Sequence, residues 1–110
     1  GSVYRSDAEG ATETASVPTE NALFQNYPNP FNPQTTIRFQ LSEAGSVSLK
    51  VFDVLGREVV TLLNERRVAG SFSAIWDAGK APSGIYYCRM TAQNESGRIF
   101  TQTQRMLLVK

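Results

Sequence analysis

The side chains in this sequence that are best able to do chemistry are two carboxylates, Asp53 and Glu58, and the thiol of Cys88. Paired carboxylates can act as general acid and base when they lie on facing strands around a cleft. Asp53 and Glu58 instead flank a single expected turn, where a turn cap and a solvated charge explain both. A serine or cysteine nucleophile needs a neighbouring base, and the chain contains no histidine. We therefore find no catalytic residues and predict that the chain is not an enzyme.

Binding chemistry is also sparse. A metal site would have to be built from oxygen ligands alone, and no clustered Asp/Asn loop is present. No glycine-rich segment follows an expected strand and opens a helix, as phosphate binding requires. We expect no cofactor and no metal. The aromatic residues Tyr27, Phe31, Trp76 and Tyr87 could stack on a sugar if they shared one face. A carbohydrate-binding or adhesive module of a secreted enzyme is therefore an alternative, although Trp76 is expected to anchor the core.

Composition limits the possible classes further. The 110 residues allow one domain, and 41% hydrophobic with 19% charged residues is ordinary for a globular chain. A net charge of +1 gives no electrostatic case for nucleic acid or an anionic membrane surface. No apolar run approaches the length of a membrane span. The single cysteine, Cys88, excludes an intrachain disulfide and is expected to be a small buried hydrophobe.

The first 22 residues are rich in Ser, Thr, Ala, Glu and Gly and have few apolar side chains. Such a segment cannot bury enough surface to offset its ordering entropy. We interpret Gly1-Ser2 as a tag remnant and residues 1–22 together as a disordered, flexible linker. The folded domain is expected over residues 23–110.

Asn26–Leu41, read as NYPNPFNPQTTIRFQL, begins the folded part. Its three prolines fix backbone angles and remove donors, which excludes a helix or a central strand there. From Thr35 to Leu41, apolar and polar residues then alternate, which is typical of a half-buried strand. Leu23-Phe24 could form a short edge strand ahead of these prolines.

Further strands are predicted from the same alternation. They cover residues 46–51, Glu58–Leu63, Ser71–Asp77, Ile85–Thr91 and the run Arg98–Lys110. Asp53–Arg57 is expected to be a tight turn, with Asp53 bonded to its backbone and Gly56 at positive φ. Asn64–Gly70, Ala78–Gly84 and Gln93–Gly97 are expected to be loops or turns.

Two points stay open at this level. Phe52 and Val54 fall on the opposite face from Val51, so either both faces are covered or a bulge intervenes. Arg57–Arg67 could instead be a helix, because it is rich in Leu and Glu. With six or seven short strands and turns every 8 to 12 residues, the fold class is all-β: an immunoglobulin-like antiparallel β-sandwich of about seven strands.

Several segments, in order, resemble a known family. NYPNPFNP at Asn26–Pro33 is followed by TTIRFQL, LKVFDVLGREV, AGSFSAIWD, SGIYYCRM and the terminal RMLLVK. Together they resemble the type A C-terminal sorting domain of the type IX secretion system, over Leu23–Lys110. Members are immunoglobulin-like modules at the ends of proteins exported across the outer membrane of Bacteroidota. The Ig-like domain of the flagellar hook-capping protein is more distantly similar, so a structural spacer is a third possibility.

The resemblance implies a secretion signal that directs an N-terminal cargo domain through the periplasm to the cell surface or the medium. Its implied partners are the type IX translocon and a sortase-like peptidase that cuts in the linker, after which the cargo can be joined to a lipopolysaccharide. The candidate translocon-recognition residues are Asp53, Gly56, Arg57, Gly84, Tyr86, Arg105, Met106, Leu108 and Lys110. A weak dimer through an open sheet edge is a further expectation.

The chain departs from the family pattern in three places. Ala78 separates Asp77 from Gly79, Cys88 replaces an aromatic or aliphatic residue, and Arg105 stands where Lys is common. Because a compact domain without catalytic groups can be recognised through a strand edge, we expect Phe100–Lys110 to be the recognised element. The alternative is that its apolar block, 106–109, only completes the core.

Overall fold

The computed structural model describes residues 18–110, so the tag remnant and linker predicted for 1–22 lie largely outside the described residues. The predicted domain start at Leu23 stays a prediction, although Ala22 already belongs to the first strand and the side chain of Asn21 accepts the amide of Ser42 at 2.8 Å. The strands are β1 Ala22–Leu23, β2 Gln34–Leu41, β3 Gly45–Phe52, β4 Glu58–Arg67, β5 Gly70–Asp77, β6 Gly84–Asn94 and β7 Ile99–Leu108. Among the described residues there is no helix long and apolar enough to cross a membrane.

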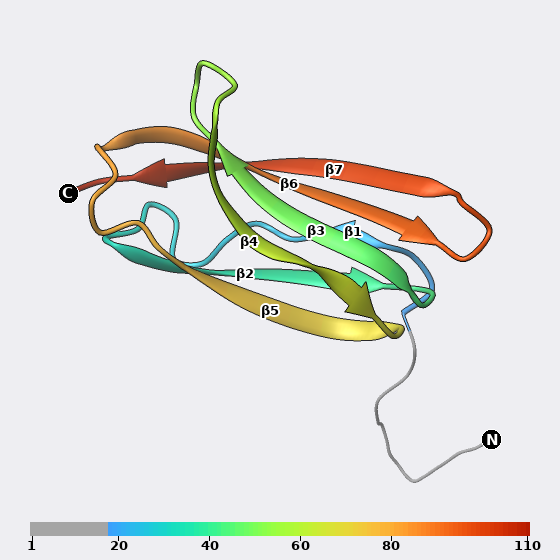
Figure 1. The fold of residues 1–110 in the computed structure, drawn as a ribbon. Coiled ribbons are helices and arrows are strands. Elements are labelled where there is room, and N and C mark those ends of the chain that lie inside the picture. The colour runs from blue at the N-terminus through green and yellow to red at the C-terminus, as the bar shows by residue number, and fades with distance from the viewer. Residues whose placement is uncertain (1–17) are drawn as a thin grey trace, which may run out of the picture.

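Two antiparallel sheets face each other (Figure 1). One has the order β1-β2-β5 and the other the order β4-β3-β6-β7. The predicted seven-stranded immunoglobulin-like sandwich is confirmed. In constant-type immunoglobulin domains the fourth strand joins the sheet of the first, second and fifth. Here β4 pairs with β3 instead, which gives a division into three and four strands.

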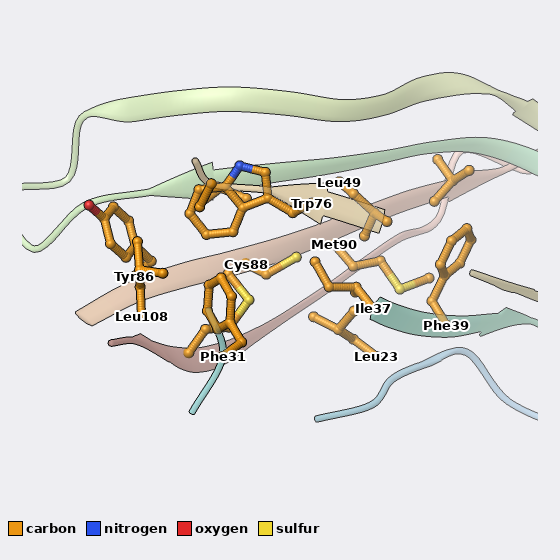
Figure 2. Packing of buried hydrophobic residues seen from close by; sticks show 14 of the residues in the cluster. Leu23, Phe31, Ile37, Phe39, Leu49, Trp76, Tyr86, Cys88, Met90 and Leu108 are labelled. Carbon is orange, nitrogen blue, oxygen red and sulfur yellow. The ribbon is translucent and has the colours of Figure 1, made fainter. Parts of the chain in front are cut away.

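Alternation in the sequence places one face of each sheet in the core. In β2, Thr35, Ile37, Phe39 and Leu41 are buried, and the residues between them are exposed or half-buried. Matching inward residues come from β3, β6 and β7, so the two inner faces interdigitate (Figure 2). Trp76 is 5% exposed and packs in this core, as the sequence predicted.

β4 is longer than the sequence predicted. Asn64–Gly70 was expected to be a polar loop, but Asn64–Arg67 continues the strand and pairs with the start of β3, and Gly70 begins β5. The charged side chains mislead because β4 is an edge strand whose outer face meets solvent. Arg67 also lies over the ring of Phe72, 5.1 Å from its centroid. The alternative of a helix over Arg57–Arg67 is wrong.

Near Phe52 the sheet has bulges, but they do not change the face of any residue of β3. The pairing of β3 with β4 shifts after Leu49 and after Val51, at points where β4 carries an extra residue. β3 itself keeps its alternation, and the ring of Phe52 faces outward beneath the guanidinium of Arg89, 4.5 Å from the centroid. The bulges therefore lie in β4, where they twist an edge strand. The predicted turn at Gln93–Gly97 begins two residues later, because Gln93 and Asn94 still belong to β6.

Antiparallel order brings the sequence motifs to one end of the sandwich. β3 ends beside the beginning of β6, and the beginning of β6 lies beside the end of β7, as the pairs Phe52↔Tyr87 and Gly84↔Leu108 show. The β3–β4 turn, the β5–β6 loop and the C-terminus are at this end (Figure 1). We refer to it as the C-terminal end of the sandwich.

Candidate functional site

The β3–β4 turn is held rigid by Asp53. One carboxylate oxygen accepts the amides of Leu55 and Arg57 at 2.9 and 3.0 Å, and the other accepts Nε of Arg57 at 2.9 Å. The bond from the Arg57 amide is the first cause of a lowered pKa of Asp53. Gly56 has φ of 81°, so both sequence predictions for this turn are confirmed. The turn projects Val54 and Leu55 into solvent, with 63% and 74% of their surfaces exposed.

The β5–β6 loop is held by the residues that follow it. Tyr86 is buried, and its hydroxyl donates to the carbonyl of Pro82 at 2.6 Å. Burial, and then the nearby carboxylate of Asp53, raise the pKa of Tyr86. Nζ of Lys110 donates to the carbonyl of Gly79 at 2.6 Å, and the Lys110 amide donates to Ser83 Oγ at 3.1 Å. The last residue of the chain is thereby attached to this loop.

A groove of about 590 Å³ lies between this turn and this loop, and its walls are largely apolar. Four of the residues that the resemblance singled out line it: Asp53, Arg57, Gly84 and Tyr86. The other lining residues are Val54, Leu55, Val59, Ala81, Pro82, Ser83 and Ile85. Gly56 shapes the turn without lining the groove.

The end of β7 lies beside this groove. Met106 and Leu108 are fully buried in the core, whereas Arg105 and Leu107 point outward. A second hollow of about 300 Å³ is lined by Arg105, Met106, Leu107, Asn29, Pro30 and Ile85. Ile85 therefore lines both hollows. Together they form one surface at the C-terminal end, which we call the end surface.

Sequence reasoning missed the outward residues of the end surface. It chose Met106 and Leu108, which complete the core, and passed over Leu107 and Ile85, which are 38% and 37% exposed. In β7 the even-numbered residues point inward from Phe100 to Leu108. That period of two was the available signal, and the uninterrupted apolar block at the end of the chain obscured it.

In the part of the chain that the structure describes, the carboxylates and aromatics give no second site. Thr61 and then Lys50 lower the pKa of Glu58, and that of Asp53 is lowered too, so neither carboxyl is prepared to act as an acid. Phe31 and Trp76 are buried with ring centroids 5.5 Å apart, while Tyr27 is 77% exposed. The aromatics suggested for sugar stacking therefore do not share an exposed face. Within residues 18–110, no three His, Cys, Asp or Glu side chains gather as metal ligands.

Comparison with known proteins finds one matching family and similar solved structures. A family profile described as "Secretion system C-terminal sorting domain" matches residues 25–102. Dimeric latent PorU from Porphyromonas gingivalis contains a similar structure, with a TM-score of 0.65 and 19% identity over 91% of this chain. The chain spans only 10% of that protein's length. CopC from Methylosinus trichosporium OB3b is similar in fold, with a TM-score of 0.52 and 15% identity over 81% of this chain and 93% of CopC. No curated protein sequence matches the chain.

Proposed function

We propose, since this chain belongs to the secretion system C-terminal sorting domain family, that residues 23–110 are a signal that a type IX translocon recognises. A sorting domain of this family marks a protein for export to the cell surface or for secretion across the outer membrane. The translocon would contact the end surface, and a sortase-like peptidase would then cut the cargo free within residues 1–22. The signal itself would perform no reaction.

The observation that carries this proposal is the position of the motif residues. Asp53 and Arg57 come from the β3–β4 turn and Gly84 from the start of β6, yet all three line one apolar groove. The stability of the fold does not require an aliphatic side chain to project from that turn into solvent, as the side chain of Leu55 does. An exposed apolar groove with polar residues at its rim is typical of a protein-binding surface.

The energetics fit a docking surface. Burying one exposed aliphatic side chain in an interface contributes about 1.5–3 kcal/mol, and Val54, Leu55 and Ile85 are available together. The hydrogen bonds of Asp53 fix the turn before any partner arrives. Less conformational entropy is then lost on binding, which favours affinity.

The test is an export assay with matched variants. Residues 1–110 are fused to the C-terminus of a periplasmic reporter in a type IX-competent cell. Leu55→Ser removes the most exposed aliphatic of the groove, and Val68→Ser is its control, because Val68 is 70% exposed at the opposite end of the sandwich. We expect the parent and Val68→Ser to reach the medium or cell surface and Leu55→Ser to stay in the periplasm.

Two results would contradict the proposal at different levels. Retention of the parent fusion in the periplasm would refute the signal function itself. Export of Leu55→Ser at the parent's level would leave the signal function standing and refute the groove as its contact surface. Proteolytic release is followed separately by sequencing the C-terminus of the exported reporter, which should end within residues 1–22.

A further inference from the structure

The segment Leu23–Phe31 runs along the outer edge of β7. Six hydrogen bonds connect it to β7 and to Val109, which follows β7. Side chains take part in four: Leu23 N to Gln102 Oε1 (2.9 Å), Gln104 Nε2 to Leu23 O (2.9 Å), Gln25 Nε2 to Arg105 O (2.7 Å) and Leu107 N to Asn29 Oδ1 (3.0 Å). The other two join backbone groups: Phe31 N to Leu107 O (3.0 Å) and Val109 N to Phe31 O (3.0 Å). A parallel bridge between Phe31 and Leu108 completes the contact. We call Leu23–Phe31 the strap.

The strap is anchored at both ends in the sandwich. Leu23 and Phe31 are 1% and 2% exposed, and Phe31 packs against Trp76. Between them, the buried amide of Asn26 donates to Thr35 Oγ1 at 2.9 Å and to the carbonyl of Pro28 at 3.1 Å. Backbone bonds to β2 add to these contacts: the amide of Phe24 donates to the carbonyl of Arg38, and Tyr27 and Thr36 bond to each other in both directions. The strap is thereby held against the body of the domain.

The strap is also suited to end a sheet. Pro28 and Pro30 lack amide donors, so their stretch cannot pair with another strand as a regular edge would. Natural sheets use proline at edges to prevent unwanted strand addition. Among the described residues, β4 and β5 are the outermost strands on the other side of the sandwich, and the bulged, charged β4 is itself a poor template.

We propose that the strap closes the edge of the C-terminal strand, so that a partner contacts β7 only through its outward side chains. This inference rests on the function proposed above and specifies the mode of recognition. The amides of Leu107 and Val109 and the carbonyls of Arg105 and Leu107 are already bonded to the strap. Strand addition along this half of β7, the docking mode expected from the sequence, would first have to displace it.

The outward side chains of this half of β7 are then the part of the strand that a partner can contact. Met106 and Leu108 point into the core, which leaves Arg105, Leu107 and Val109 facing solvent. Leu107 lies beside Ile85 in the register of β6 and β7, and the two share the second hollow of the end surface. The fitting partner is a protein that lays an apolar surface, with an acidic group near Arg105, over the sheet face. A free β-strand does not fit.

Amide hydrogen exchange on the full chain tests whether the strap closes the edge. Gln25→Ala/Asn29→Ala removes two side-chain bonds to β7 but leaves the backbone bonds between Phe31 and β7 intact. Gln34→Ala/Gln40→Ala is the control, since it removes two amide side chains bonded elsewhere, to Asp77 and Glu20. We expect the Phe31 and Val109 amides to exchange about tenfold faster in the strap variant alone.

The exchange result is read against amides at the centre of β6. Faster exchange confined to Phe31 and Val109 supports the strap, and parent-like rates at both positions overturn it. If the centre of β6 also accelerates because the double variant is destabilised as a whole, the single variant Gln25→Ala is measured by the same comparison. It loses the bonds of Gln25 Nε2 to the carbonyl of Arg105 and to Asn26 Oδ1 and keeps Asn29.

Export of the reporter fusion tests the consequence for recognition. If the partner contacts side chains, Leu107→Ser lowers export of the fusion, and the fusion with the strap variant is exported no better than the parent. If the partner adds a strand, the strap variant exports better than the parent, which overturns the proposed mode of reading. A parent fusion that is not exported refutes the proposed function, and the exchange measurement still decides whether the strap exists.

Discussion

The hydroxyl of Tyr86 donates to the carbonyl of Pro82 at 2.6 Å, and Tyr86 stands two residues before Cys88. In immunoglobulin domains, a tyrosine two residues before the second cysteine bonds to the backbone a few residues upstream and fixes a corner between strands. Tyr86 therefore holds the β5–β6 loop, and with it one wall of the groove, in the manner of a tyrosine corner. A role in recognition, as proposed from the resemblance, would act through this loop.

Tyr86→Phe should lower the free energy of unfolding by about 1 kcal/mol, because it removes one hydrogen bond of a buried hydroxyl and keeps the ring. Urea denaturation measures this. Tyr87→Phe is the control, since Tyr87 lies on the outer face and is only half-buried. Equal stability of Tyr86→Phe and the parent would contradict the structural role of the hydroxyl.

Phe31→Ala should cost about 3–5 kcal/mol of stability, the usual range for a buried phenylalanine. Phe31 is 2% exposed and lies 5.5 Å from Trp76, which is the single tryptophan. The emission of Trp76 should shift to longer wavelength in the folded variant, because water gains access to the indole.

Phe24→Ala provides the comparison for Phe31→Ala, since the ring of Phe24 is 40% exposed and lies beneath Arg38. Its cost should stay below about 1 kcal/mol, with no change in Trp76 emission. Similar losses for both variants would show that the segment around Phe31 does not contribute to the core.

Gly45→Ala should be far more damaging than Gly56→Ala. A Cβ at Gly45 would overlap the carbonyl oxygen of Gln93, so β3 and β6 would have to separate; a loss of about 3 kcal/mol is expected. At Gly56 a Cβ has nothing within 4 Å, and only the positive φ opposes alanine, at about 1–2 kcal/mol. Thermal unfolding of the two variants gives the ranking, and the reverse order would contradict the close approach of β6 to Gly45.

Local patterns were sufficient to predict most of the fold. The alternation of Ile37, Phe39 and Leu41 predicted β2, and Asp53 with Gly56 predicted the β3–β4 turn, because each depends on neighbours in the chain. The strap was not predicted. It depends on contacts between residues nearly eighty positions apart, and its polar bonds use glutamine and asparagine side chains, which have no periodic pattern.

The sequence indicated some of the residues that line the candidate groove and not others. Motif resemblance indicated the turn and the start of β6, and the sandwich brings both to one groove. It did not separate the outward Leu107 from the inward Met106 and Leu108. The period of two in β7 carries that information, but the uninterrupted apolar block at the end of the chain obscured it.

The buried thiol of Cys88 predicts how the free energy of unfolding depends on pH. Burial raises the pKa of its thiol from 9.0 to about 12, so the folded state keeps the proton that the unfolded state releases. The stabilising effect is complete below pH 9 and is lost as the pH rises toward 12, by about 1.4 kcal/mol per pH unit between the two values. Urea denaturation from about pH 8 to pH 10.5 should show this decline. In Cys88→Ala the slope should be smaller by that amount, while the residual decline reflects other groups such as Tyr86, whose pKa is also raised by burial. Identical slopes in the parent and Cys88→Ala would mean that the thiol is open to solvent, and a thiol reagent would then label the folded protein rapidly near pH 8.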